Sequence, residues 1–78
     1  MFVGIKMPML SDTVDEYRIT KLFAKAGDTA VKGEPMMEVE SDKGSMTVCF
    51  YNTGKITELT VREGDTVKYN SLIGVIDE

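Results

Sequence analysis

Short runs in which apolar and polar residues alternate make up most of the chain, with Gly, Asp and Asn between them. A period of two is typical of β-strands that turn one face toward a core. Six runs predict strands at Val3–Met7, Tyr17–Phe23, Met36–Glu40, Ser45–Phe50, Lys55–Val61 and Leu72–Ile76. Two shorter pieces follow Gly-Asp turns, near Ala30-Val31 and Val67-Lys68. Eight short strands separated by turn signals predict an all-β sandwich or flattened barrel.

An internal repeat organises these strands. Residues 18–29 match residues 55–66 at a constant spacing of 37, with six identical pairs among the twelve positions. After one skipped residue, the segment Pro35–Val39 matches Ser71–Val75 at a spacing of 36. Two copies are too few for a stacked solenoid. The repeat therefore predicts two half-domains that pack face to face about a pseudo-twofold axis.

The first copy on its own is ambiguous between a strand and a helix. Residues 14–26 contain a helical spacing of apolar side chains at i, i+3, i+4 and i+7, namely Ile19, Leu22, Phe23 and Ala26. The second copy has Thr60 and Glu63 in this stripe and is rich in Thr and Val, which favour strands. Both copies are therefore predicted to be strands, ended by turns at Gly27 and Gly64.

The composition excludes several classes of function. The 78 residues carry 13 acidic and nine basic side chains, a net charge of −4, so no basic surface for nucleic acid is expected. No apolar run approaches the roughly 20 residues that span a bilayer. Histidine is absent and Cys49 lies mid-strand without a basic neighbour, so neither a catalytic residue nor a metal site is expected. We expect one domain, residues 1–78, in a reducing compartment.

Lys43 is the one side chain whose position suggests chemistry. It lies at the predicted turn of a β-hairpin within Glu38–Val48, between Asp42 and Gly44. These are also ordinary turn residues, since Asp tolerates tight backbone geometry and Gly suits the end of a type I turn or a bulge. At the spacing of 36, the counterpart of Lys43 would be position 79, one past Glu78. The hairpin is therefore expected at one end of the molecule and the chain termini at the other.

These segments resemble the lipoyl domains of 2-oxo acid dehydrogenase complexes. Val39–Lys43 matches the family's attachment strand, and Lys6–Val14 resembles its first strand and following loop. The two Gly-Asp turns, Lys25–Asp28 and Arg62–Asp65, resemble its repeated Lys-Glu-Gly-Asp turn. The resemblance implies two four-stranded antiparallel sheets in a flattened, quasi-twofold barrel. The chain departs from the family at two positions: Gly44 replaces the usual Ala after the lysine, and Glu16-Tyr17 replaces the usual Glu-Gly.

The resemblance also implies a function. Lipoic acid would be joined to Lys43 by an amide bond, with Asp42 and Gly44 shaping the turn, and the domain would carry acyl groups without catalysing a reaction itself. The implied partners are a lipoate ligase or lipoyl transferase, a thiamine-dependent 2-oxo acid decarboxylase, an acyltransferase core and dihydrolipoyl dehydrogenase. The implied location is the cytoplasm, or the mitochondrial matrix for a eukaryotic parent. No nucleic acid or membrane is expected as a partner.

The loop Ser11–Glu16 is acidic, and the resemblance places it beside the Lys43 hairpin. Asp12, Asp15 and Glu16 are therefore candidates for recognition of the decarboxylase, with Val14 expected to be exposed among them. A solvated connection explains the same composition.

Three other readings remain open. Biotin carrier domains share the fold but place Met on both sides of the lysine, whereas here Met46 is three residues away. An unmodified lipoyl-like interaction module would usually lack the Asp-Lys pair. Carriers of the glycine-cleavage type are longer and contain additional helices.

Overall fold

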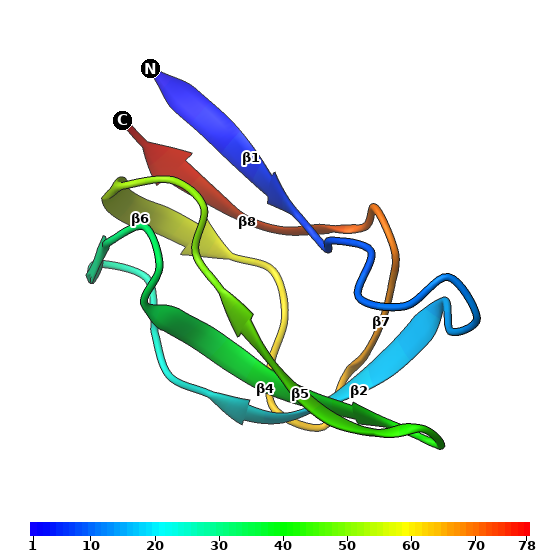
Figure 1. Ribbon diagram of the computed structural model, residues 1–78. Helices are drawn as coiled ribbons and strands as arrows, with labels where there is room; N and C mark the ends of the chain where they lie inside the picture. The colour runs from blue at the N-terminus through cyan, green and yellow to red at the C-terminus, as the bar shows by residue number, and fades with distance from the viewer.

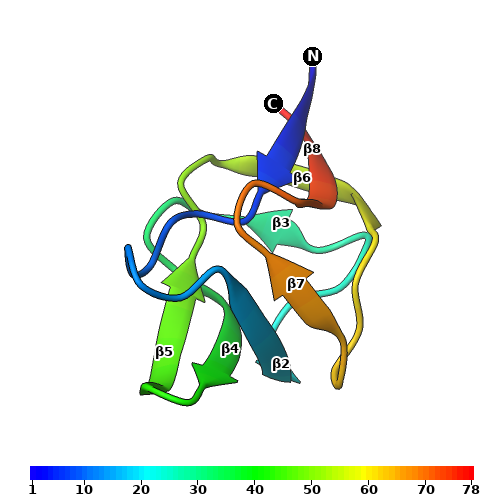
Figure 2. The same cartoon turned by 90° about the vertical axis from the view of Figure 1, so that its right-hand side faces the viewer.

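The computed structural model describes all 78 residues as eight β-strands, with no helix that could span a membrane. The strands are β1 (Phe2–Lys6), β2 (Glu16–Leu22), β3 (Thr29–Ala30), β4 (Pro35–Ser41), β5 (Gly44–Cys49), β6 (Gly54–Leu59), β7 (Thr66–Lys68) and β8 (Leu72–Asp77). They form two antiparallel sheets with the orders β1-β8-β6-β3 and β5-β4-β2-β7 (Figure 1). Figure 2 shows one sheet lying above the other. The predicted strands and the all-β class are confirmed, and the helical alternative for residues 14–26 is wrong.

A single apolar core fills the space between the sheets. It contains 14 buried hydrophobic residues, and no polar or charged residue is buried with them. Ile19 and Ile56, the equivalent residues of the two repeats, are 1% and 0% exposed. Burying an aliphatic side chain of this size contributes about 1.5–3 kcal/mol. These buried apolar side chains hold the two sheets together.

The pseudo-twofold symmetry is confirmed by the strand order. Exchanging β1 with β5, β8 with β4, β6 with β2 and β3 with β7 converts one sheet into the other. The register obeys the same rule, because Ile19 pairs with Val39 and Ile56 pairs with Ile76. Both members of the second pair lie 37 residues after those of the first. The two halves therefore share one register as well as one topology.

The spacing of 36 predicted for the downstream strands is wrong, because no residue is skipped. The segments with the same burial pattern are Pro35–Val39 and Leu72–Ile76. In each, the second, third and fifth residues are buried. Their spacing is 37. The sequence match placed Val39 on Val75 because the two residues are identical, although Val75 is only half-buried and Ile76 is the core residue. The burial pattern of the folded structure, and not residue identity, therefore gives the correct alignment of the two repeats.

The chain termini occupy the place of a second hairpin. At the true spacing, the counterpart of Lys43 is position 80, two beyond Glu78. Ser41 pairs with Gly44 on either side of the hairpin turn. At the symmetric place, the Glu78 amide donates to the Met1 carbonyl at 2.9 Å and the Met1 ammonium donates to the Glu78 carbonyl at 3.2 Å. Figure 1 shows the termini and the β4–β5 hairpin at opposite ends, as predicted.

The two Gly-Asp turns link each half to the other. The Gly27 amide donates to the Ile56 carbonyl, and the Gly64 amide donates to the Ile19 carbonyl, each at 2.8 Å. Gly27 has φ 98° and Gly64 has φ 93°, a region that side-chain-bearing residues rarely adopt. These glycines let the chain leave one sheet, bond across to the other half and continue as β3 or β7.

Each turn is closed by its aspartate. An Asp28 carboxylate oxygen accepts the Lys25 amide at 3.1 Å, and an Asp65 carboxylate oxygen accepts the Arg62 amide at 2.9 Å. The identical Gly-Asp pairs of the repeat therefore have a local cause. Gly supplies the backbone conformation, and Asp satisfies an amide that the turn leaves without a strand partner.

Tyr17 breaks the symmetry inside the core. It is 2% exposed, and its hydroxyl has no hydrogen-bond partner. Its symmetric counterpart is Gly54, where an added Cβ would lie 2.6 Å from the Asp77 carbonyl oxygen. A large side chain is therefore accommodated at one of the two equivalent positions and excluded at the other. Tyr17 serves the core, so this departure from the family's Glu-Gly lies inside the barrel and not on its surface.

Replacing Tyr17 with Phe should stabilise the domain, because it removes a buried hydroxyl that bonds to nothing. We expect the free energy of unfolding to rise by about 1 kcal/mol in urea titrations. Tyr51→Phe is the matched control, because the Tyr51 hydroxyl donates to the Lys6 carbonyl and its loss should lower stability. A loss of stability in Tyr17→Phe would show that the hydroxyl is bonded in solution.

Candidate functional site

The β4–β5 hairpin ends in a two-residue turn formed by Asp42 and Lys43. Ser41 and Gly44 are the last paired residues before it. Gly44 has φ 123°, whereas neither Asp42 nor Lys43 has positive φ. This differs from the primed turns usual in two-residue hairpins, in which the first turn residue has positive φ. The positive φ falls on the glycine after the lysine, the residue type that adopts it most readily.

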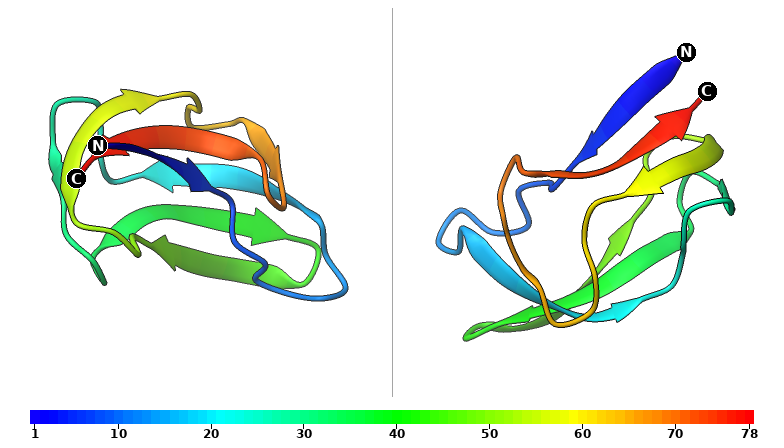
Figure 3. Two further views of the ribbon diagram at one scale, coloured as in Figure 1. Left: turned by 90° about the horizontal axis from the view of Figure 1, so that it is seen from above. Right: turned by 180° about the vertical axis from the view of Figure 1, so that it is seen from behind.

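Ser41 holds the lysine backbone in place. Its hydroxyl oxygen accepts the Lys43 amide at 3.1 Å, a side-chain bond that mimics a backbone turn. The Lys43 side chain is exposed, and none of the three ion pairs in the structure includes its ammonium group. Figures 1 and 3 show the hairpin tip projecting at one end of the molecule. The turn therefore fixes the backbone of Lys43 and leaves its amine free.

An ion pair ties the hairpin to the neighbouring strand. Arg18 on β2 lies directly opposite Glu40 on β4, and its Nε donates to a Glu40 carboxylate oxygen at 3.0 Å. Both side chains are largely exposed, so the pair contributes at most about 1 kcal/mol. Its effect is to hold Glu40 on the outer face of the sheet.

The acidic loop contains a turn built like that of the hairpin. Ser11 and Val14 form an isolated β-bridge, and the Ser11 hydroxyl oxygen accepts the Thr13 amide at 3.2 Å. Asp12 therefore occupies the position that Asp42 has in the hairpin turn, and it is exposed. The prediction that Val14 is exposed is wrong: it is half-buried and packs against the core. The bridge draws Val14 inward, so the exposed side chains of the loop are polar: Asp12, Thr13 and Asp15.

The three acidic candidates differ in their surroundings. Asp15 is exposed, and its carbonyl accepts the Tyr69 amide at 3.0 Å, which anchors the loop to the β7–β8 turn. Glu16 is the first residue of β2, not part of the loop, and its carboxylate lies 3.8 Å from the Lys68 ammonium. Asp12 has no ion pair. Figures 1 and 3 show the loop at the same end of the molecule as the hairpin.

Other reactive groups form no second chemical centre. Cys49 ends β5 as an exposed free thiol, and no three His, Cys, Asp or Glu residues are placed to hold a metal ion. Burial raises the pKa of the Tyr51 hydroxyl above its ordinary value of 10.0, and that hydroxyl donates to the Lys6 carbonyl.

An open pocket of about 450 Å³ was missed from the sequence. Its lining residues come from the segment after β2, the turn into β3, the start of β4 and the segment after β5. No motif connects these segments, so only the fold brings them together.

Comparison with known proteins identifies the family. Residues 3–76 match the biotin/lipoyl family model, which is described as "Biotin-requiring enzyme". The chain belongs to this biotin/lipoyl attachment family. Family membership confirms the predicted resemblance and matches the all-β fold.

The relatives of this chain are much longer proteins. The chain is 36% identical over 77 residues to the dihydrolipoyllysine-residue succinyltransferase component of the 2-oxoglutarate dehydrogenase complex of Bartonella vinsonii, covering 99% of this chain and 19% of the relative. It is also 36% identical over 77 residues to the acetyltransferase component of the pyruvate dehydrogenase complex of Rhizobium meliloti, covering 97% and 17%. The chain therefore spans about a fifth of the length of these relatives.

Solved structures agree on the fold. The lipoyl domain of the 2-oxoglutarate dehydrogenase complex from Azotobacter vinelandii superposes with a TM-score of 0.74 and 29% identity, covering 97% of this chain and 96% of that one. The urea carboxylase of Kluyveromyces lactis superposes with a TM-score of 0.76 at 23% identity, covering 99% of this chain and 6% of that one. The second likeness shows the fold alone.

Replacing Gly44 with Val should disturb the hairpin, because a β-branched residue resists positive φ. We expect the free energy of unfolding to fall by about 1–3 kcal/mol and the amides of the tip to exchange faster with deuterium. Ser45→Val is the matched control, since it adds the same side chain one residue later on exposed β5. Equal stability of both variants would show that the tip has another conformation in solution.

Proposed function

We propose that this chain is a lipoyl carrier domain and that Lys43 is its attachment residue. The observation that carries the proposal is an exposed, unpaired amine at the tip of a backbone-fixed hairpin. The family and the likeness to the Azotobacter vinelandii lipoyl domain support it. An enzyme that acylates the lysine needs access to the amine and a defined approach, and this turn offers both.

Lipoic acid, not biotin, is the proposed group. The family includes biotin-requiring enzymes, so membership alone leaves both groups open. Asp42 and Gly44 flank the lysine where biotin carriers have Met, and the matched relatives are named as dihydrolipoyllysine acyltransferases. These two observations favour lipoic acid.

The dithiolane of bound lipoic acid would supply reversible thiol–disulfide chemistry and a sulfur that carries an acyl group. The chain's own contribution is position. Ser41 and Gly44 hold the turn, and the amide bond at Lys43 removes one positive charge, changing the net charge from −4 to −5. A group tethered in this way reaches successive active sites at a high effective concentration.

The partners follow from the proposal. A lipoate ligase or lipoyl transferase would modify Lys43. A thiamine-dependent 2-oxo acid decarboxylase, an acyltransferase core and dihydrolipoyl dehydrogenase would then use the carried group in turn. The relatives are components of 2-oxo acid dehydrogenase complexes, and the lipoyl-like part is about a fifth of their length. The acyltransferase core would therefore lie outside these 78 residues.

Incubation with lipoate ligase, ATP and lipoate should add one lipoyl group to the domain. Intact-mass analysis should detect a single adduct in the wild type and none in Lys43→Gln. Lys25→Gln is the matched control, because Lys25 is an exposed lysine beside a different turn. An adduct that persists in Lys43→Gln, or a wild type that accepts biotin from a biotin ligase in preference, contradicts the proposal.

We further propose that the acidic loop recognises the decarboxylase. Asp12 and Asp15 are exposed, and neither takes part in an ion pair. They would attract a basic rim around the partner's active site and accelerate encounter more than they strengthen binding. Glu16 would contribute less, since Lys68 partly neutralises its charge.

Replacing Asp12 and Asp15 with Lys should slow reductive acylation by the cognate decarboxylase about fivefold or more at low salt, and less at high salt. Ligase modification of Lys43 should stay nearly unchanged. The double variant Glu38→Lys with Glu58→Lys is the matched control, because it changes the net charge equally on other surfaces. Equal slowing in both double variants would mean that overall charge, not this loop, controls the encounter.

A further inference from the structure

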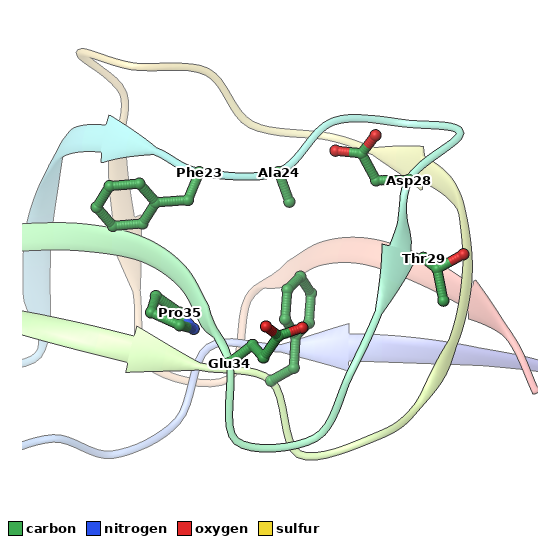
Figure 4. Close-up of a pocket in the computed structure, with 7 residues that line it drawn as sticks. Phe23, Ala24, Asp28, Thr29, Glu34 and Pro35 are labelled. Atoms are coloured by element: carbon green, nitrogen blue, oxygen red, sulfur yellow. The ribbon is translucent and has the colours of Figure 1, made fainter.

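A pocket lies at the Pro35 end of β4, at the opposite end of that strand from the hairpin turn. Phe23, Pro35 and Phe50 supply apolar lining, and Asp28 and Glu34 add two carboxylates. Figure 4 shows Phe23 and Asp28 along one side and Pro35 and Glu34 along the other. Its volume of about 450 Å³ lies within the range of ordinary ligand sites. The pocket is therefore large enough for a side chain of another molecule.

The charge of the pocket selects the kind of side chain. No basic residue lines it. One Asp28 oxygen already accepts the Lys25 amide, whereas the Glu34 carboxylate has neither an ion pair nor a side-chain hydrogen bond. Glu34 is exposed, so a cation can reach its carboxylate while the stem of the cationic side chain packs on the apolar lining. The ligand should therefore carry a positive charge at the end of an apolar stem.

The other half of the molecule is an internal control for this pocket. It has the same Gly-Asp turn and the same backbone hydrogen bonds, yet the structure contains no second pocket. The Gly33 amide donates to the Phe50 carbonyl and the Asn70 amide to the Met7 carbonyl, which makes Phe50 and Met7 equivalent.

The side chains at the equivalent positions differ in kind. Thr60 replaces Phe23 and Ser71 replaces Glu34, whereas Asp65 retains the aspartate. Because the symmetric half lacks both the aromatic wall and the free carboxylate, the fold itself does not require the pocket.

We infer that this pocket is a docking site for an arginine side chain of a partner protein. A planar guanidinium stacks on an aromatic face such as Phe23 and donates two parallel hydrogen bonds to a carboxylate such as Glu34. Lysine has the charge but not the planar fork, so arginine is preferred. The inference is independent of the group carried on Lys43.

The position of the pocket separates docking from modification. β4 runs from Pro35 at the pocket to Ser41 at the hairpin turn, seven residues in all. A strand of that length spans about 20 Å. A partner held at Glu34 and Phe23 would therefore leave the Lys43 amine free to move.

The test is titration of the ¹⁵N-labelled domain with two acetylated, amidated tripeptides, Ala-Arg-Ala and Ala-Gln-Ala. We expect amide shifts confined to the pocket segments with the arginine peptide and none with the glutamine peptide. Glu34→Gln and Phe23→Ser should each weaken arginine binding at least about fivefold. Glu38→Gln is the matched control, since it removes one carboxylate of β4 outside the pocket, and it should bind as the wild type does.

Three results would overturn the inference. The first is a set of shifts spread over the acidic surface, the second is equal weakening by Glu38→Gln, and the third is equal binding of the glutamine peptide. The dispersion of the amide spectrum shows for each variant that the fold is intact. Lys43→Gln should bind the arginine peptide with unchanged affinity, and a loss of binding there would also contradict the separation of the two sites.

Discussion

Reciprocal backbone hydrogen bonds between the two halves fix the order of the strands in both sheets. Each Gly-Asp turn bonds to the central strand of the other half, through Gly27 to Ile56 and through Gly64 to Ile19. The chain then continues as β3 beside β6, or as β7 beside β2. Each half therefore completes the other's sheet, and neither half has a whole sheet of its own. A hairpin attached to such a frame inherits its rigidity, which is what an attachment turn requires.

The symmetry of the frame isolates the features that serve something other than folding. Where both halves agree, as in the Gly-Asp turns, backbone geometry explains the residues. Where equivalent positions of the two halves carry different residues, the shared backbone geometry does not explain the difference. The Lys43 turn stands opposite the chain termini, the Phe23 pocket has no equivalent, and Tyr17 stands opposite a glycine that admits no side chain. The first two of these three differences lie on the surface, and each is a site proposed to meet another molecule.

Most of the fold could be predicted from the sequence because its signals are local. Alternation and turn signals located the strands. The second copy decided against a helix in residues 14–26, because it breaks the apolar stripe at Thr60 and Glu63 and is rich in Thr and Val. The spacing of 36 failed because identity at Val39 and Val75 outweighed the burial pattern, which only the packed structure contains. The prediction that Val14 is exposed was wrong for the same reason: its burial depends on the folded structure, in which the bridge to Ser11 turns it toward the core. The Lys43 turn could be predicted from adjacent residues, whereas the pocket could not, because its lining comes from separate segments.

The Lys43 turn and the Phe23 pocket lie at the two ends of β4, and the acidic loop lies at the same end of the molecule as the turn. A carrier must be held near its partners, and it must also let the attached group move between active sites. Tight contacts at the hairpin would hold the carrier near its partner, but they would cover the turn and restrict the movement of the attached group. Exposed Asp12 and Asp15 act at a distance through charge, so they guide encounter without enclosing Lys43. A short-range contact at Glu34, on the opposite end of the strand from Ser41, adds residence time where it cannot hinder the amine. The rigid barrel allows this division, because it keeps the two ends at a fixed separation.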